Sequence, residues 1–120
     1  MPLTKTKRTE ICRRIFDKSH EIREKINQEL RAIGIDRPIG AEHMCLLFQA
    51  EGLDGFLSAL RQRRPIRECI DLANERMSES VKKFNDNHPK EWQIHRDPST
   101  AERSTVSRIL SCIFGRTIVL

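Results

Sequence analysis

The sequence contains no tyrosine, one tryptophan and five phenylalanines, so aromatic residues make up only 5% of its 120 residues. Unbroken apolar stretches are short. The longest, Met44 to Phe48, is far below the roughly 20 residues that a membrane-spanning helix needs, and no apolar signal segment follows the basic start. Together with a charged fraction of 32%, these absences predict a soluble, cytoplasmic protein with a single domain over residues 1–120.

Motifs of the common enzyme classes are missing as well. There is no glycine-rich phosphate loop, no H-E-x-x-H zinc motif and no G-x-S-x-G nucleophile motif. Glu42, His43 and Cys45 are close in sequence, but on a helix they point in different directions and so do not face one substrate. Glu75 and Glu79 would share a helix face, yet a cation needs further carboxylates. We therefore expect a protein that is not an enzyme and that uses no metal or cofactor.

The four cysteines lack the spacing of a metal site. No two of them form a C-x-x-C pair, and no histidine follows at the spacing of a zinc finger. Each has apolar neighbours at helical intervals, which predicts buried, reduced thiols. These residues are Cys12, Cys45, Cys69 and Cys112.

Apolar residues recur at intervals of three, four or seven over most of the chain, which is the pattern of amphipathic α-helices. No stretch shows the alternation of a half-buried strand. The expected fold is therefore all-α: a compact, five-helix, bundle-like domain with a short apolar C-terminal tail. The spacing predicts two long helices over residues 9–33 and 66–84, two short ones over 41–50 and 53–60, and a last helix over 100–114.

Residues typical of helix ends mark most of these boundaries. Glycine is expected to stop a helix at three positions, Gly34, Gly52 and Gly115. Pro65 suits the first turn of the helix that follows it, because its missing N–H would be unpaired there. Asp54 is a plausible N-cap, and Ser99 with Glu102 three residues later matches a capping box.

Three segments are expected to lie outside regular helices: a basic N-terminal arm over 1–8, an irregular connection over 85–98 and the tail over 117–120. The tail either packs back on its own core or adds to a partner or a second copy. Trp92 either covers a small satellite core or anchors an interface. The candidate interface residues are therefore Trp92, Ile118, Val119 and Leu120.

Charge of one sign dominates only slightly, because 22 lysines and arginines against 17 aspartates and glutamates leave a net charge of +5. The residue type is more informative than the total. Arginine outnumbers lysine by 15 to 7, and the planar guanidinium pairs with phosphate or carboxylate through two parallel hydrogen bonds. This preference indicates a partner that carries negative charge.

Many of these cations gather in three foci along the chain. If two foci meet on one face of the folded protein, they would neutralise several phosphates, and the affinity would fall steeply with salt. The opposing interpretation is a solvated helix surface with acids such as Glu68 and Glu75 among the arginines. The candidate binding residues are Lys5, Lys7, Arg8, Arg13 and Arg14 in the first focus, Arg61, Arg63, Arg64 and Arg67 in the second, and Arg103 and Arg108, with Arg116, in the third.

These patterns predict a non-enzymatic helical protein that docks an arginine-rich face on nucleic acid or on a nucleoprotein complex. Stacking on unpaired bases is not expected, because tyrosine is absent and the phenylalanines occupy apparent core positions. An acidic protein surface would satisfy the same arginines. The main alternative is therefore a small protein-binding adaptor or inhibitor, of the kind carried by phages and other mobile elements, that covers a site on a larger host complex. A third alternative is a subunit that self-associates into a homo-oligomer through its long helices.

Overall fold

The computed structural model describes residues 4–33, 41–87 and 99–120, and every regular element in these ranges is an α-helix. The prediction of an all-α fold is confirmed. The predicted number of five helices is wrong, because the described chain forms four. They are α1 (Lys5–Ile33), α2 (Ala41–Arg61), α3 (Ile66–Asp86) and α4 (Ser99–Phe114).

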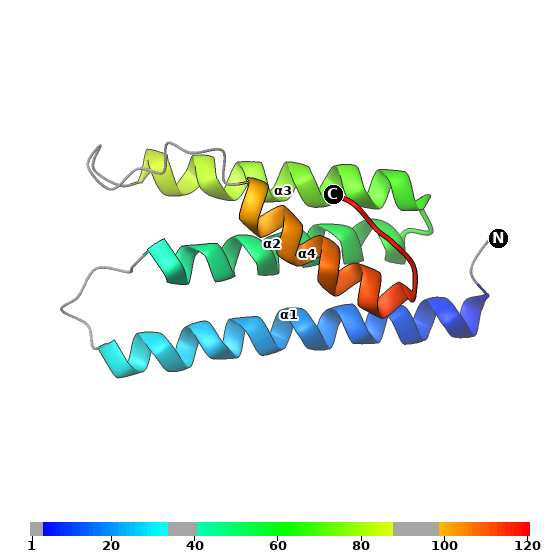
Figure 1. The fold of residues 1–120 in the computed structure, drawn as a ribbon, viewed down its shortest axis with the longest axis horizontal. Helices are drawn as coiled ribbons and strands as arrows, with labels where there is room; N and C mark the ends of the chain where they lie inside the picture. The colour runs from blue at the N-terminus through cyan, green and yellow to red at the C-terminus, as the bar shows by residue number, and fades with distance from the viewer. Residues whose placement is uncertain (1–3, 34–40, 88–98) are drawn as a thin grey trace.

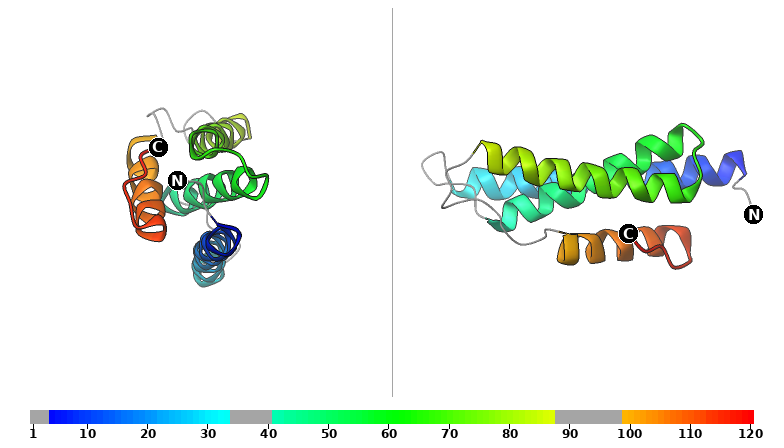
Figure 2. Two further views of the ribbon diagram at one scale, coloured as in Figure 1. Left: turned by 90° about the vertical axis from the view of Figure 1, so that its right-hand side faces the viewer. Right: turned by 90° about the horizontal axis from the view of Figure 1, so that it is seen from above.

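The first three helices lie side by side and alternate in direction, as Figure 1 shows. α2 lies between α1 and α3, and α4 covers one side of this layer (Figure 2). α4 runs obliquely across α2 and ends against the N-terminal half of α1, where the Arg14 guanidinium donates to the carbonyl oxygen of Ile113 over 3.1 Å. This contact satisfies one of the carbonyls that the end of α4 leaves without an intrahelical partner.

Residues 41–61 form one continuous helix, so the prediction of two short helices separated at Gly52 is wrong. Both glycines of α2 face α3 at close range. A Cβ atom added to Gly52 would lie 2.8 Å from Met77 Sδ, and one added to Gly55 would lie 3.0 Å from the carbonyl oxygen of Leu72. Tertiary packing therefore outweighs the roughly 1 kcal/mol that each glycine costs inside a helix, and the missing side chains let α2 and α3 approach closely.

Asp54 does not cap a helix but joins α2 to α1. The hydroxyl of Ser19, which is 2% exposed, donates to Asp54 Oδ1 over 2.6 Å, and Arg23 donates both to Asp54 Oδ2 and to Glu51. Burial by itself would lower the pKa of Arg23, but the hydrogen bonds and charges of Asp54 and Glu51 outweigh it and raise that pKa. This polar cluster fixes the register of α1 on α2.

The apolar stripes predicted for the long helices form the core. The buried positions are Ile11, Ile15 and Ile22 on α1, Ala73, Met77, Val81 and Phe84 on α3, and Val106, Leu110 and Ile113 on α4. α2 buries side chains on several of its faces, as its central position requires. Its Phe56 ring is fully buried and meets the ring of Phe114 edge to face, with 5.7 Å between the centroids.

The four cysteines are free, as predicted, but their burial differs. Cys69 is fully buried, Cys12 and Cys45 are half-buried, and Cys112 is exposed. The prediction of a buried thiol is therefore wrong for Cys112. Its apolar neighbours in sequence do not cover it, because adjacent residues on a helix point in different directions.

The buried thiol of Cys69 makes the fold less stable at alkaline pH. Burial raises the pKa of its thiol from 9.0 to about 11. The folded protein therefore keeps a proton that the unfolded chain loses above pH 9, and the resulting stabilisation is complete below pH 9 and lost as the pH rises through 11. The shift corresponds to a stabilisation of roughly 2 to 3 kcal/mol.

We compare the free energy of unfolding of the wild type with that of Cys69→Ala. The difference, wild type minus variant, is expected to fall by roughly 2 to 3 kcal/mol between pH 8 and pH 11. Urea denaturation at each pH measures this difference, in which the titration of all other groups cancels. The matched control is Cys112→Ala, which removes an exposed thiol in place of a buried one. A constant difference for Cys69→Ala would contradict the prediction.

α1 begins at Lys5, four residues before the predicted start, so Lys5 to Arg8 are helical rather than part of an arm. The Thr4 hydroxyl accepts a hydrogen bond from the backbone N–H of Lys7 over 3.1 Å and thereby caps the helix. At the start of α3, the carbonyl oxygen of Pro65 accepts hydrogen bonds from the backbone of Glu68 and Cys69. Gly115 ends α4 as predicted, with a φ of +68° in the left-handed region that favours glycine.

The C-terminal tail turns back along α4. Ser111 Oγ accepts a hydrogen bond from the backbone N–H of Ile118 over 2.8 Å and donates to the carbonyl oxygen of the same residue, and Ser107 Oγ accepts one from the N–H of Leu120. Ile118 is buried in the core, so the tail packs on its own chain. Val119 is 69% exposed, and it leaves the tail an apolar side chain that is free for an interface.

Several sequence-based expectations fall on residues that the structure does not describe. They are the stop at Gly34, the side chain of Ser99 in the capping box, Trp92, and positions 88–98 of the predicted irregular connection. The first two residues of that connection belong to α3, which ends at Asp86. Within the described helices, none combines the length and the apolar character required to cross a membrane.

Candidate functional site

A hollow lies where the N-terminal turns of α1 meet the C-terminal end of α2. Its volume of about 530 Å³ is within the usual range for ligand sites. We call it the basic hollow. Its lining residues are Lys5, Arg8, Thr9, Cys12, Arg13 and Phe16 from α1, together with Arg61 and Arg63 from the end of α2 and the turn after it.

Five of the eight lining residues are cations, and none is an aspartate or a glutamate. The ion pairs found among the described residues join Lys18 to Glu21 and Arg23 to the acids of α2, and none of them involves the hollow. Glu10 lies beside the hollow, in a neighbouring depression that it shares with Lys5 and Arg13. Two cationic foci that are far apart in the sequence thus meet without a neutralising carboxylate in the lining.

The spacing of residues along α1 explains how this helix contributes to the hollow. Arg8 and Thr9 each lie three or four residues from both Lys5 and Cys12, which places these side chains on one face of the helix. Phe16 continues the same face one turn further along. The first focus therefore supplies a row of side chains, whereas its position opposite Arg61 depends on how α1 packs against α2.

The turn after α2 places Arg63 at the hollow at a conformational cost. The backbone N–H of Arg64 donates to the carbonyl oxygen of Ala59, and the backbone N–H of Arg63 donates to the carbonyl oxygen of Leu60. These two hydrogen bonds form a Schellman motif. Arg63 therefore occupies the position that is normally glycine, and its φ is +62°. A side chain in this left-handed conformation costs on the order of 1 kcal/mol, and such strain is concentrated at functional sites.

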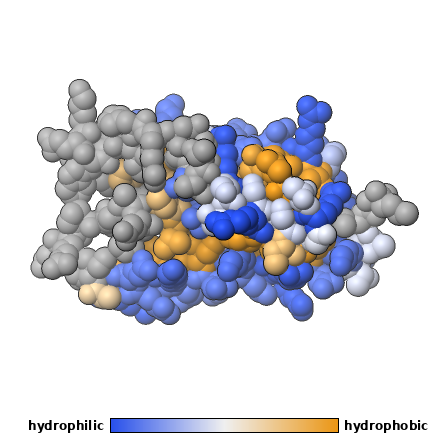
Figure 3. Space-filling model, viewed as in Figure 1, coloured by the Kyte–Doolittle hydropathy of each residue, from blue (hydrophilic) through white to orange (hydrophobic). Residues whose placement is uncertain are grey.

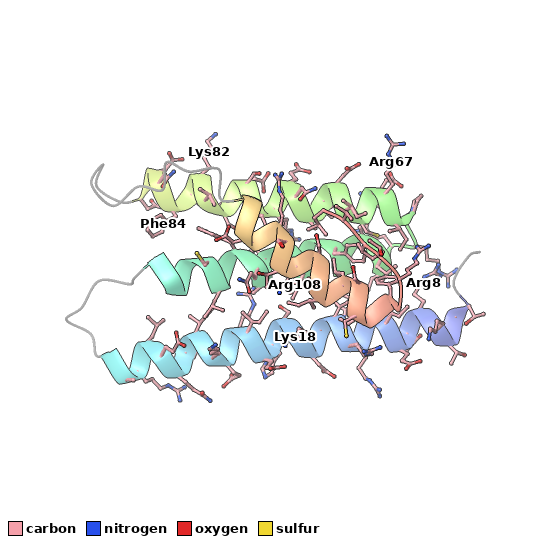
Figure 4. The ribbon with its side chains drawn as sticks, in the orientation of Figure 1. Arg8, Lys18, Arg67, Lys82, Phe84 and Arg108 are labelled. Carbon is pink, nitrogen blue, oxygen red and sulfur yellow. The ribbon has the colours of Figure 1, made fainter. Side chains whose placement is uncertain are left out.

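Arg8 of α1 and Arg61 at the end of α2 both line the hollow, as does Cys12. Burial raises the pKa of the Cys12 thiol, while the charges of Arg61 and Arg8 act in the opposite direction. The Nε atom of Arg8 is buried and has no hydrogen-bond partner within the described chain. Arg8 extends from α1 toward the end of the molecule where α2 turns into α3 (Figure 4).

Phe16 is the aromatic residue of the site. Its side chain is 50% exposed, so the interpretation that the phenylalanines occupy core positions is wrong at this residue. The Arg61 guanidinium lies 5.8 Å from the centroid of the Phe16 ring, within the range of a cation–π contact. One turn along α1, the ring of His20 is within 5° of parallel to that of Phe16, with 6.3 Å between the centroids.

The other candidate binding residues do not line the basic hollow. Lys7 and Arg64 are exposed beside it, and Arg14 holds the end of α4 through the carbonyl of Ile113. Arg67 extends from α3 away from the rest of the molecule (Figure 4). The third focus lies on and after α4, with Arg103 half-buried and Arg116 exposed beyond Gly115, while Arg108 lines a depression together with Arg14 of the first focus.

A second depression runs between α1 and α4. It combines the apolar side chains of Ile109 and Ile113 with charges of both signs, among them Arg108 and Asp17. Figure 3 shows apolar surface interrupted by hydrophilic side chains on this face. We call it the α1–α4 groove. Its mixed charge distinguishes it from the basic hollow, because its three cations are largely offset by two carboxylates, Asp17 and Glu21.

No group of three or more histidine, cysteine, aspartate or glutamate residues in the described ranges is placed to hold a metal ion. Comparison of the chain with protein-family models, with curated proteins and with solved structures finds no match. The residues of the basic hollow and their geometry are therefore the basis for a functional proposal.

Proposed function

We propose that this protein is a non-enzymatic module that binds nucleic acid, free or within a nucleoprotein complex, through the basic hollow. The observation that carries the proposal is the meeting of Lys5, Arg8 and Arg13 with Arg61 and Arg63 in a lining without carboxylates. A solvated helix surface would instead pair these cations with acidic side chains, and none of the ion pairs found among the described residues involves them.

The physical basis is the release of counterions from phosphates. Five cations that each neutralise one phosphate of a duplex give a slope of about −4.5 in a plot of log affinity against log salt concentration. Affinity would then fall roughly 500-fold between 50 and 200 mM salt. Four of the five cations are arginines, whose planar head groups grip phosphate oxygens with two hydrogen bonds.

The backbone at Arg63 supports the same conclusion. A glycine at this position would adopt a φ of +62° without strain. The chain instead carries an arginine whose side chain lines the hollow. The cation is therefore retained at the expense of stability, as expected of a residue that serves binding.

Variants at Arg61 and Arg63 test whether these residues contribute to binding and whether Arg63 lowers stability. We expect Arg61→Ala combined with Arg63→Gly to weaken binding to mixed-sequence DNA or RNA roughly 10- to 100-fold at 50 mM salt and to reduce the salt slope by about 2. Arg63→Gly alone should raise the free energy of unfolding by about 1 kcal/mol while it weakens binding. Fluorescence anisotropy over a range of salt concentrations and urea denaturation are the two measurements.

The matched control is Lys82→Ala combined with Lys83→Ala, which removes the same charge. Lys82 lies toward the opposite end of α3 from the hollow (Figure 4). This variant should lose no more than about threefold in affinity, because it alters only the long-range field. Absence of binding by the wild type at low salt, or an equal loss in both variants, would refute the proposal.

A second candidate function is the adaptor or inhibitor that covers a site on a larger protein complex. The α1–α4 groove favours it, because an apolar floor with charges of both signs suits a protein partner better than a polyanion. A pull-down from nuclease-treated host extract separates the two. A nuclease-resistant protein partner that is lost on Ile109→Asp and kept on Arg61→Ala would support the adaptor.

A further inference from the structure

We infer that the basic hollow selects single-stranded over duplex nucleic acid, with an unpaired base stacked at Phe16 and the adjoining phosphates held by the hollow's cations. This inference rests on the proposed function and names the form of its ligand. It reverses the sequence-based expectation about stacking, which rested on the absence of tyrosine and on phenylalanines at apparent core positions.

The first observation is the exposure of Phe16. Three phenylalanines of the described chain are buried, at positions 48, 56 and 84, whereas half of the Phe16 side chain is open to solvent. Phe16 also lines the same hollow as the five cations. A strand whose phosphates occupy the hollow would therefore bring its bases within reach of this ring.

The second observation is the set of flat groups around the ring. Arg61 lies 5.8 Å from the ring centroid and is a lining cation of the hollow. His20 is exposed, and its ring is nearly parallel to that of Phe16 at a centroid distance of 6.3 Å. Arginine planes and aromatic rings are the groups on which proteins stack unpaired bases, and here three such groups lie close together at the cationic site.

Stacking of this kind discriminates between forms of nucleic acid. In a duplex both faces of each internal base are already stacked, and the bases present only their edges in the grooves. Phosphates are available in either form. The cations alone would therefore bind both, and the Phe16 surface adds affinity for a strand whose bases are unpaired.

The test compares three ligands of equal length: a single-stranded DNA, the same sequence as RNA, and the corresponding DNA duplex. Fluorescence anisotropy at fixed salt should give wild-type binding to the single strands at least 10-fold tighter than to the duplex. Phe16→Ala should weaken single-strand binding roughly 10- to 100-fold and leave duplex binding within about twofold. Phe16→Leu, which keeps an apolar side chain without an aromatic face, should behave like Phe16→Ala, whereas Phe16→Trp should retain the affinity.

The variant Arg61→Ala with Arg63→Gly distinguishes failure of this inference from failure of the proposed function. It should weaken the binding of single strand and duplex alike. If the wild type prefers the duplex, or if Phe16→Ala binds single strands as tightly as wild type, the stacking inference is wrong while the cationic site stands. If neither ligand binds at low salt, both proposals are wrong. Circular dichroism and the Tm of Phe16→Ala confirm that the half-exposed substitution leaves the fold intact.

Discussion

Replacing Gly55 by leucine is expected to lower the free energy of unfolding by about 3 kcal/mol or more. A Cβ atom at this position would already lie 3.0 Å from the carbonyl oxygen of Leu72 and 3.3 Å from Ala73 Cα, both of which belong to the backbone of α3. A backbone does not rotate away as a side chain does, so α3 has to move as a whole. Overpacking of this kind typically costs about 1 to 3 kcal/mol, and the separation of two core helices adds the loss of their other contacts.

Urea denaturation of Gly55→Leu measures the effect, and two variants calibrate it. Gly52→Ala places its Cβ against the side chain of Met77 rather than against backbone. Because a methionine side chain adapts its shape, this variant should lose much less stability than Gly55→Leu. Ser78→Leu introduces the same side chain at an exposed position of α3 and should change stability by no more than about 0.5 kcal/mol. A Gly55→Leu variant as stable as Ser78→Leu would show that α2 and α3 are not closely packed.

Phe56→Ala is expected to lower the free energy of unfolding by about 4 kcal/mol. The Phe56 ring is fully buried and makes an edge-to-face contact with Phe114 near the end of α4. Removal of a buried phenylalanine ring costs roughly 3 to 5 kcal/mol, because it loses the transfer energy of the ring and leaves a cavity. A loss of this size is a large part of the 5 to 15 kcal/mol that stabilises a typical domain.

The matched control is Phe16→Ala, which removes the same side chain from a position that is 50% exposed. It should cost no more than about 1 kcal/mol, since much of the Phe16 ring is in water in the folded state. Thermal unfolding of the two variants side by side tests the assignment of one ring to the core and the other to the surface. Similar losses of stability in the two variants would contradict it.

Local sequence patterns were sufficient to predict the long helices. The intervals of three and four that place Ile11 with Ile15, and Met77 with Val81, are a property of the helix itself, and these residues are buried in the folded protein. Gly115 ended a helix as predicted because its left-handed conformation is also a local property. The prediction that Gly52 divides α2 into two helices was wrong. A glycine can stop a helix or let a neighbouring helix approach, and the local sequence does not distinguish these two roles.

The candidate site was predicted in part. The sequence identified the cations of the first two foci, and their proximity on α1 follows from helical spacing. Two features could not be read from local patterns. The exposure of Phe16 depends on which face of α1 lies against α2, and the use of Arg14 at the end of α4 depends on a contact between the two ends of the chain.

By itself, the sequence determined that this protein is helical, which residues form its core stripes, and that its excess charge is carried mainly by arginine. Only the tertiary structure decided that Lys5, Arg8 and Arg13 face Arg61 and Arg63 across one hollow, with Phe16 at its edge. The reason is physical. A helical stripe is set by contacts three or four residues apart. The distance between two helices is set by residues that meet other helices, such as Gly55, whose lack of a side chain admits α3, and Asp54, which accepts a hydrogen bond from Ser19 of α1.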